Sequence, residues 1–329
     1  MVALDSLLSL QDLEGELARV EAALRQAVEA GDPFMTTVAS HLVPAGGKRL
    51  RPALAVCVGR LAASAAGGPV HQDVIMGACA VELVHLGSLY HDDVMDEART
   101  RRNVESVNSK WGNLVAILAG DFLLARASEI AASLGTEVAG LLATTIGSLC
   151  EGQVRELSQA YDLGRTEEAY LVSISGKTGA LMATSCRIGA LTAGLSRDAV
   201  EAFTQYGERL GMVFQIVDDI LDVVATDEEL GKPAGNDLVE GVYTLPVIRA
   251  LASAGTADSL RPLLGRHIEP EAVAEARRII RSNGAVPAAL NVARGYAREA
   301  VAVLEPFGEA AEIDALRALT ANLTDSVPA

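Results

Sequence analysis

Apolar residues recur at helical spacing along almost the whole chain. The pattern predicts helices over 8–30, 50–64, 73–95, 113–134, 137–160, 167–195, 198–224 and 241–252, with further helices to about residue 322. No run of alternating β-branched residues ends in an Asn-Gly or Asp-Gly turn, so no strand is expected. No Pro/Ser-rich linker, shift in composition or internal repeat divides the sequence. We therefore expect an all-α bundle, with residues 1–329 in a single domain.

Two of the predicted helices end in clusters of aspartates, and each is followed by a polar loop, over 97–112 and 225–240. The first cluster is Asp92, Asp93 and Asp96; the second is Asp218, Asp219 and Asp222. Carboxylates at i and i+4 share one face of a helix, about 6 Å apart, and repel each other. The helix dipole also disfavours anions at a C-terminus. Because the preceding residues are apolar, part of each cluster should be poorly solvated, and a cation must compensate.

The composition of the clusters indicates which cation this is. Carboxylate oxygens without cysteine favour Mg²⁺ or a similar ion, which keeps several waters and commonly bridges carboxylates to phosphate oxygens. A single Asp-Asp-x-x-Asp is more often a solvated helix face. Two copies on separate apolar helices, each followed by a loop with Arg or Lys, favour a metal–diphosphate site.

Several basic residues are placed in the sequence where they could lie near the aspartate clusters. They are Lys48 and Arg51 in the turn Gly-Gly-Lys-Arg-Leu-Arg-Pro (46–52), Arg99, Arg101 and Arg102 after the first cluster, Lys232 after the second, and Lys177 in an apolar stretch. A lone lysine such as Lys177 is more often a surface residue whose charge reaches water. The chain has 27 basic and 43 acidic residues and a formal charge of −16. That balance argues against nucleic acid or anionic membrane as the main partner, whereas local cations beside acids predict an anionic ligand bridged by metal.

Other candidate chemistry is weaker. Glu82 and His85 have the Glu-x-x-His spacing of di-iron bundles, but that fold needs two such motifs and a second is missing. His85 is then either a phosphate or substrate contact or a satisfied core histidine. The cysteines (Cys57, Cys79, Cys150 and Cys186) form no CxxC pair and are expected to be buried, reduced thiols.

The sequence shows neither a signal peptide nor a transmembrane segment. The first residues lack the basic region of a signal peptide, and charged residues interrupt the apolar stretches before they reach the length of a transmembrane helix. We expect a cytoplasmic protein with no transmembrane segment and at most transient membrane contact when product is released.

Taken in order, the motifs resemble those of the trans-polyprenyl diphosphate synthases. The resemblance spans about residues 46–247 and includes both aspartate clusters, the glycine-basic turn, the arginine pair, Gly-Lys-Thr-Gly (176–179), Phe214-Gln215 and Gly231-Lys232. It implies the class I isoprenoid synthase fold, an orthogonal helical bundle around a deep apolar cavity. It also implies a homodimer and joining of isopentenyl diphosphate to the carbocation of an ionised allylic diphosphate, with pyrophosphate as the base that removes the final proton.

The resemblance also implies roles for individual residues. Asp92, Asp96 and Asp218 resemble magnesium ligands, with three ions bridging them to the allylic diphosphate, and Asp93, Asp219 and Asp222 complete or orient the shell. Lys48, Arg51, His85 and Arg102 resemble the residues that bind isopentenyl diphosphate. Arg101, Lys177, Thr178, Gln215 and Lys232 resemble contacts to the allylic diphosphate and the developing cation.

Two positions depart from the family pattern. Asn103 replaces the usual Gly after the arginine pair, although Asn tolerates left-handed backbone. The C-terminal tail lacks the basic end found in some relatives. Neither departure removes a predicted metal ligand.

Small side chains precede the first cluster and bear on product length. Gly87 and Ser88 lie about one helical turn before Asp92, where a growing chain would descend, and Val84 and Val81 follow on the next turns. In the family, aromatic residues there enforce short products. We therefore expect a product longer than geranylgeranyl, of roughly thirty to fifty carbons. The alternative is that Gly87 and Ser88 merely allow close helix packing.

Several other functions fit part of the pattern. A geranylgeranyl or farnesyl diphosphate synthase differs only in product length. A terpene cyclase normally mixes Asn, Ser, Thr and Glu in its second motif, and a non-catalytic subunit of a heteromeric prenyl synthase tends to lose aspartates. A purely structural helical protein would be indifferent to magnesium and diphosphate.

Overall fold

The computed structural model describes residues 5–230 and 233–328, and these residues are almost entirely helical. The helices of the N-terminal half are α1 (Asp5–Leu8), α2 (Leu13–Ala27), α3 (Pro33–Ala39), α4 (Leu50–Ala66), α5 (Gln72–Met95), α6 (Val107–Trp111), α7 (Asn113–Ser133) and α8 (Thr136–Ser158). Those of the C-terminal half are α9 (Glu167–Ile174), α10 (Ala180–Thr192), α11 (Arg197–Val224), α12 (Asp227–Leu230), α13 (Asn236–Val239), α14 (Leu245–Ala252), α15 (Ala254–Leu260), α16 (Pro270–Ser282), α17 (Ala285–Val303) and α18 (Ala311–Asp325). The 3₁₀ segments are η2 (Arg261–Leu263) and η3 (Glu305–Phe307). The all-α prediction is confirmed.

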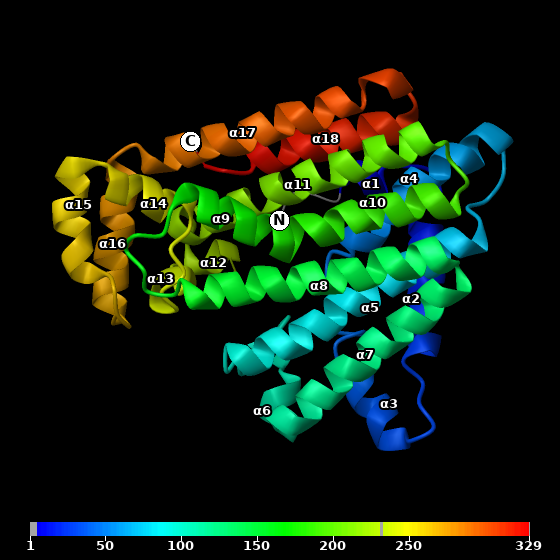
Figure 1. Cartoon of the computed structure of the whole chain (residues 1–329), viewed down its shortest axis with the longest axis horizontal. Helices are drawn as coiled ribbons and strands as arrows, with labels where there is room; N and C mark the ends of the chain where they lie inside the picture. The colour runs from blue at the N-terminus through cyan, green and yellow to red at the C-terminus, as the bar shows by residue number, and fades with distance from the viewer. Residues whose placement is uncertain (1–4, 231–232, 329) are drawn as a thin grey trace.

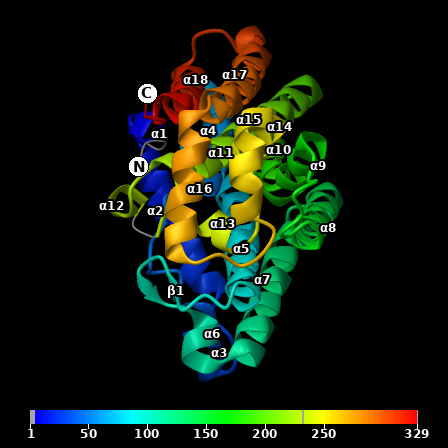
Figure 2. The same cartoon turned by 90° about the vertical axis from the view of Figure 1, so that its left-hand side faces the viewer.

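The long helices pack side by side around the middle of the molecule. Helix α5 packs on α4 and α7, α10 packs on α4 and α11, and α17 covers α11 (Figure 1). Figure 2 shows the group α14, α15 and α16 at one end of these helices, with α13 behind it. Buried apolar residues form one cluster that extends from Leu7 to Val327. Most of them are Ala, Leu, Val and Ile, which pack helices closely.

The helix ends follow from local sequence. Helix α11 begins after Ser196, whose hydroxyl accepts a hydrogen bond from the Ala199 backbone N–H. Helix α3 begins after Asp32 in the same way, with Pro33 in its first turn. The helix predicted over 241–252 instead begins at Leu245, because Pro246 suits a first turn and not a helix interior.

Two local structures differ from the prediction. The stretch 167–195 is interrupted by a π-helical segment, η1 (Ser175–Gly179), between α9 and α10. The first polar loop contains a small antiparallel hairpin of β1 (Thr100–Arg101) and β2 (Val104–Glu105), although no strand was expected. Its turn residues Arg102 and Asn103 have φ of 54° and 63°, the pattern of a type I′ turn. Asn103 thus adopts the left-handed backbone that its residue type tolerates.

Helix α5 runs through the centre of the bundle and carries the first aspartate cluster at its C-terminal end. Among the described residues it alone is long and apolar enough to cross a membrane, but 72% of the relevant window is buried inside the protein. Burial of that kind is typical of a core helix.

Candidate active site

One aspartate from each cluster lines a polar cavity of about 490 Å³. Asp96 lines it from the end of α5, and Asp219 lines it from α11. Lys177 from η1 and Gln215 from α11 lie on the same wall. Segments more than a hundred residues apart in the sequence therefore place their acids around a shared space.

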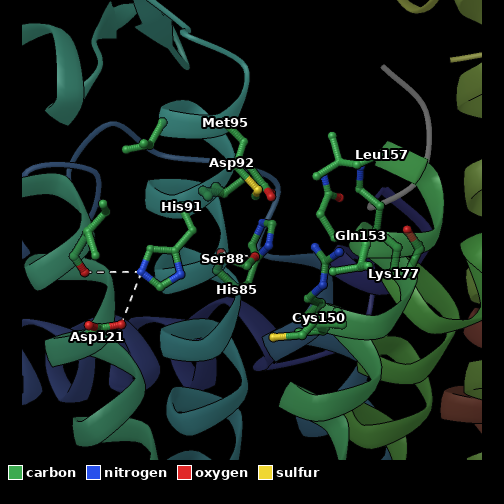
Figure 3. A pocket seen from close by; sticks show the side chains of 17 residues that line it. His85, Ser88, His91, Asp92, Met95, Asp121, Cys150, Gln153, Leu157 and Lys177 are labelled. Carbon is green, nitrogen blue, oxygen red and sulfur yellow. Dashed lines mark hydrogen bonds and ion pairs between the residues drawn. The ribbon is translucent and has the colours of Figure 1, made fainter. Parts of the chain in front are cut away.

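A second, mostly apolar cavity of about 480 Å³ opens beside the first (Figure 3). Ser88 and Asp92 line it from α5, and Cys150 and Leu157 line it from α8. Lys177 lines both cavities, as do Met95, Gln153 and Leu157. A charged region and an apolar region thus adjoin at the Lys177 ammonium.

The Asp92 and Asp96 carboxylates are in an unfavourable electrostatic environment. Burial raises the pKa of Asp92 to about 6, partly offset by Lys177 and reinforced by Asp96. Partial desolvation also raises the pKa of Asp96, whose side chain is exposed where it lines the polar cavity. Both residues lie at the C-terminal end of α5, where the helix dipole opposes negative charge. A cation in the polar cavity would relieve both effects.

Asp219 is held by a chain of hydrogen bonds. Its Oδ2 accepts from the Tyr170 hydroxyl at 2.5 Å, and its Oδ1 accepts from the Gln215 amide at 2.8 Å. The Gln215 carbonyl in turn accepts from the Thr178 hydroxyl at 2.7 Å. Burial raises the pKa of Asp219 to about 7, against the effect of these two donors. The chain fixes the orientation of the Gln215 amide beside the cavity.

Lys177 keeps its charge despite burial. Its Nζ donates to Glu156 Oε1 at 2.6 Å. Burial opposes the charge, but Glu156, Asp92 and Asp96 outweigh it and raise the pKa of Lys177. Backbone packing makes this position possible, because Gly152 lets α8 lie against η1: a Cβ there would meet the Lys177 backbone N at 2.6 Å.

The remaining aspartates of the clusters face other groups. Asp93 is fully buried, and its Oδ1 accepts from Arg101 Nη2 at 2.6 Å. Asp222 is also buried, and its Oδ2 accepts from the Asp237 backbone N–H at 3.3 Å. Asp218 is exposed and lines neither cavity. Asp93 and Asp222 therefore connect their helices to the loops that follow.

The predicted cations lie at different depths. Arg51 and His85 line the apolar cavity, whereas Lys48 is exposed and lines neither cavity. Burial lowers the pKa of Arg51 to about 10, which leaves it charged at neutral pH. Burial and the surrounding arginines hold the pKa of His85 well below its ordinary value, so its ring is neutral. Lys232 lies outside the described residues.

Arg102 returns from the hairpin to the glycine turn. It donates to the Gly46 carbonyl, and its Nη2 lies 3.4 Å from His85 Nε2. Gly47 has φ of 124°, and a Cβ there would lie 2.7 Å from the Arg102 guanidinium carbon. The positive φ favours glycine here, and a side chain at this position would displace the Arg102 guanidinium.

Protein groups alone do not complete a metal site in the described part of the chain. Over residues 5–230 and 233–328, no three His, Cys, Asp or Glu side chains come close enough together to hold one ion. Oxygen donors from Asp92 and Asp96 nevertheless suit a hard divalent cation that completes its shell with phosphate oxygens and water.

The residues expected to set product length divide into two groups. Ser88 lines the apolar cavity, whereas Gly87 is buried against α7, where a Cβ would lie 3.1 Å from the Gly120 carbonyl oxygen. Val84 and Val81 are fully buried. Gly87 thus serves the close packing of α5 on α7, which was the alternative interpretation of its size.

The cysteine prediction was partly wrong. Cys57, Cys79 and Cys186 are buried, but Cys150 is exposed and lines the apolar cavity. It lies on the face of α8 turned toward α5, a position that tertiary packing decides.

Sequence reasoning missed three residues of this region: Glu156, Tyr170 and Arg49. Glu156 and Tyr170 touch predicted site residues through contacts across the fold, and no local pattern marks them. Arg49 lies within the predicted basic turn, yet its side chain faces Glu21 and Glu82 instead of a cavity.

Comparisons with known proteins agree with this geometry. Residues 32–281 match the family model described as polyprenyl synthetase. The chain is 39% identical over 286 residues to nonaprenyl diphosphate synthase of Mycobacterium tuberculosis, covering 86% of this chain and 84% of that protein. It is 41% identical over 283 residues to short chain isoprenyl diphosphate synthase of Methanothermobacter thermautotrophicus, covering 84% and 85%.

A solved structure extends the agreement to the whole fold. Polyprenyl synthase from Caulobacter crescentus, complexed with calcium and isoprenyl diphosphate, superimposes with a TM-score of 0.91 at 33% identity over 99% of both chains. Because the family model matches residues 32–281, most of this chain, and because Asp96 and Asp219 of the two clusters line one cavity, this chain belongs to the polyprenyl synthetase family.

Proposed function

We propose that this protein is a long-chain trans-polyprenyl diphosphate synthase that condenses isopentenyl diphosphate with an allylic diphosphate. The observation that carries the proposal is the position of Lys177. It lies between a polar cavity lined by Asp96 and Asp219, one aspartate of each cluster, and an apolar cavity lined by Asp92. A diphosphate headgroup fits the first space, and a hydrocarbon chain fits the second.

The polar cavity would bind the allylic diphosphate through divalent ions. Asp92 and Asp96 from α5 and the α11 cluster with Asp218 would hold Mg²⁺, with three ions as in the sequence-based expectation. The raised pKa of Asp92 and Asp96 supports a cation site, because Lys177 and Arg101 offset only part of the effect of burial on these carboxylates. Bound ions would neutralise negative charge on the departing pyrophosphate.

Side chains of the protein would then stabilise the leaving group and the carbocation. Lys177 would stabilise the leaving pyrophosphate, while the Gln215 and Thr178 oxygens lie beside the cavity and favour a developing positive charge. The apolar walls exclude water from the cation. Arg51, His85 and Arg102 would bind the second diphosphate, with Lys48 at the exposed rim and Arg101 positioned through Asp93.

Product length is proposed from the α5 wall of the apolar cavity. Ser88 is small and leaves the space below Asp92 open, and no Phe, Tyr or Trp side chain lines the cavity among the described residues. The relatives include both long-chain and short-chain synthases, so the cavity supplies the argument for a product longer than geranylgeranyl. A geranylgeranyl or farnesyl diphosphate synthase is the competing assignment.

One assay tests the function. Purified protein would be given labelled isopentenyl diphosphate with geranyl, farnesyl or geranylgeranyl diphosphate and Mg²⁺, and the products would be sized. We expect Mg²⁺-dependent products longer than twenty carbons, roughly thirty to fifty, that are abolished by EDTA. Turnover that ignores chelation would refute the metal site, and a twenty-carbon end product would refute the long-chain assignment alone. Lack of isopentenyl diphosphate consumption would favour a non-catalytic subunit.

A further inference from the structure

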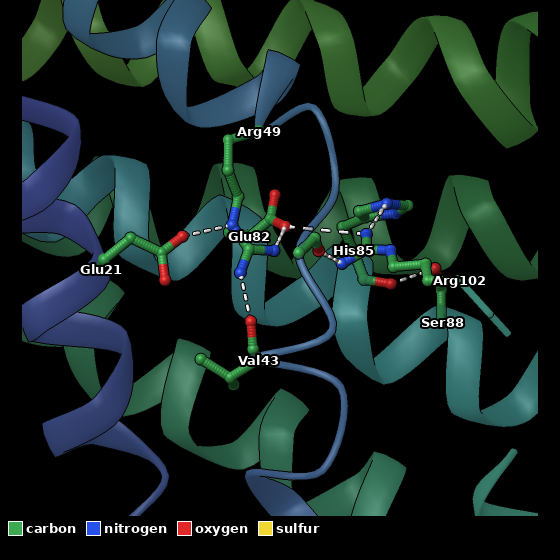
Figure 4. Close-up of polar contacts among 8 residues, drawn as sticks. Glu21, Val43, Arg49, Glu82, His85, Ser88 and Arg102 are labelled. Carbon is green, nitrogen blue, oxygen red and sulfur yellow. Dashed lines mark hydrogen bonds and ion pairs between the residues drawn. The ribbon is translucent and has the colours of Figure 1, made fainter. Parts of the chain in front are cut away.

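A buried carboxylate, Glu82, lies among the arginines near the second proposed diphosphate subsite. Glu82 is 1% exposed and lies on α5, one turn before His85. Its Oε1 accepts from Arg49 Nη1 at 2.7 Å and lies 4.0 Å from Arg102 Nη2 (Figure 4). Burying an ionised carboxylate is costly unless it is paired, so Glu82 depends on these cations.

Arg49 connects Glu82 to the rest of the subsite. Besides Glu82, it donates to Glu21 on α2 and to the Val43 carbonyl at 2.8 Å. Its own backbone is left-handed, with φ of 46°, at the residue that precedes α4. One guanidinium thereby joins α2, the glycine turn and α5 at the point where Arg51 enters the cavity wall.

The cluster carries more positive than negative charge. Arg49, Arg51 and Arg102 outnumber the carboxylates Glu21 and Glu82, and the neighbouring His85 ring is neutral. Arg51 Nε is buried and has no hydrogen-bond partner within the described residues. Surplus positive charge and an unsatisfied donor on a residue that lines a cavity are features of a site prepared for an anion.

We propose that Glu82, acting through Arg49 and Arg102, is a positioning residue that holds the arginines of the subsite for isopentenyl diphosphate. Glu82 does not touch the substrate, because its carboxylate would repel a diphosphate and its side chain is enclosed. The inference rests on the proposed function, specifically on assigning Arg51, His85 and Arg102 to that substrate.

The experiment compares Glu82→Gln with a matched control. Glu312→Gln removes a carboxylate that is also buried and close to an arginine, Arg60, but neither Glu312 nor Arg60 lines either cavity. Michaelis constants for isopentenyl diphosphate and for the allylic primer would be measured separately, with melting curves for each variant. For Glu82→Gln we expect the KM for isopentenyl diphosphate to rise about tenfold, with the KM for the primer within about twofold. Glu312→Gln should leave both KM values unchanged.

The direction of the change in KM for isopentenyl diphosphate distinguishes a positioning role of Glu82 from a purely electrostatic one. Removing a negative charge makes the cluster more cationic, which by itself would lower the KM for a diphosphate. A rise in this KM therefore indicates that the arginines are no longer held in place. A lower or unchanged KM for isopentenyl diphosphate in Glu82→Gln would overturn the proposal, and so would an equal rise in both KM values. If Glu82→Gln fails to fold, Glu82→Asp replaces it, because it keeps the charge but shortens the side chain. It is expected to raise the KM for isopentenyl diphosphate, and a lower or unchanged KM, or an equal rise in both KM values, would again overturn the proposal.

A second variant keeps failure of this inference distinct from failure of the subsite assignment. Arg51→Lys keeps the charge but loses the guanidinium, and it should raise the KM for isopentenyl diphosphate whatever Glu82 does. If Arg51→Lys raises this KM and Glu82→Gln does not, the role of Glu82 is wrong and the subsite stands. If neither variant changes it, the subsite itself is wrong.

Discussion

At the scale of single residues, the first aspartate cluster lowers the stability of the fold while it provides ligands for a cation. Asp92 is partly buried at the end of α5, and its folded-state pKa of about 6 lies above the ordinary value of 3.8. Because the folded pKa is raised, the folded state disfavours the ionised form. This cost appears as the pH rises from about 4 to about 6 and is complete above that range. Without a bound cation, the Asp92 carboxylate destabilises the fold at neutral pH.

We therefore predict that Asp92→Asn is more stable than the parent protein when metal is absent. The gain at pH 8 should be about 1 to 3 kcal/mol, or a few degrees in melting temperature, and it should be smaller at pH 5. Thermal unfolding in EDTA at both pH values measures it. Activity with Mg²⁺ should fall about a hundredfold or more. A variant less stable than the parent at pH 8 would show that Asp92 is not under electrostatic stress.

Neighbouring small residues on α5 should respond differently to enlargement. Ser88→Phe places a ring in the apolar cavity, so with farnesyl diphosphate as primer we expect products to shorten to about twenty carbons or fewer. Ser88→Ala is the control and should keep the parent product. Gly87→Ala should cost about 1 to 3 kcal/mol of stability without shortening the product, because its Cβ would meet Gly120 and Leu124. Unchanged product length in Ser88→Phe would mean that the chain grows elsewhere.

At the scale of elements, the π-helical segment η1 positions Lys177 against α8. Gly152 and Gly176 make this approach possible: a Cβ at Gly152 would lie 2.6 Å from the Lys177 backbone N, and one at Gly176 would lie 2.9 Å from the Ser148 carbonyl oxygen. A π turn widens the helix locally, and such turns are frequent at functional sites. The contact between α8 and η1 therefore determines where the ammonium lies.

Gly152→Ala tests this contact, with Gly147→Ala on the same helix as its control. In Gly152→Ala, backbone must shift, so we expect a loss of about 2 kcal/mol or more in stability, or about a tenfold loss in kcat/KM for the primer. Gly147 has open space around its Cβ position, so its alanine variant should be neutral or gain up to about 1 kcal/mol in stability. Equal behaviour of the two variants would refute the role of the contact.

At the scale of the whole molecule, a large apolar face on α7 and α8 is exposed. Leu114, Ile117 and Leu118 are 73%, 41% and 53% exposed and share one face of α7, while Val154 and Leu157 are 63% and 51% exposed on α8. Contiguous exposed apolar patches usually mark interaction sites. The face adjoins the mouth of the apolar cavity, which Ile117, Val154 and Leu157 also line. We propose a homodimer formed through this face.

We predict that the double variant Leu114→Glu/Leu118→Glu is monomeric. The substitution places charges where two copies would bury apolar surface, which should raise the dimer dissociation constant about a hundredfold or more. Light scattering after size exclusion measures the mass. Val172→Glu on α9, where Val172 is 43% exposed, is the control and should remain dimeric. A parent protein of monomer mass at micromolar concentration would contradict the proposal.

Much of the fold could be predicted because it follows from local pattern. Apolar spacing predicted the helix that became α11 to within one residue at its start, and the capping Ser196 explains that boundary. Asn103 adopts the left-handed backbone that its residue type tolerates. The interruption at η1 was missed because it depends on close packing against α8. The hairpin at 100–105 was missed because its turn is Arg102-Asn103 instead of Asn-Gly or Asp-Gly. A single domain and a cytoplasmic location stay predictions.

The sequence by itself determined most of the helices, the two acidic helix ends and the poor solvation of part of each cluster, because spacing and neighbouring apolar residues decide these features locally. The tertiary structure decided that the buried aspartates are Asp93, Asp219 and Asp222. Only the tertiary structure decided that Asp96 and Asp219 share a cavity, that Glu156 and Tyr170 support the site, and that Gly87 faces α7 while Ser88 faces the cavity. Which side of a helix is covered depends on the helices that pack on it. Such contacts join residues far apart in the chain, and no local pattern encodes them.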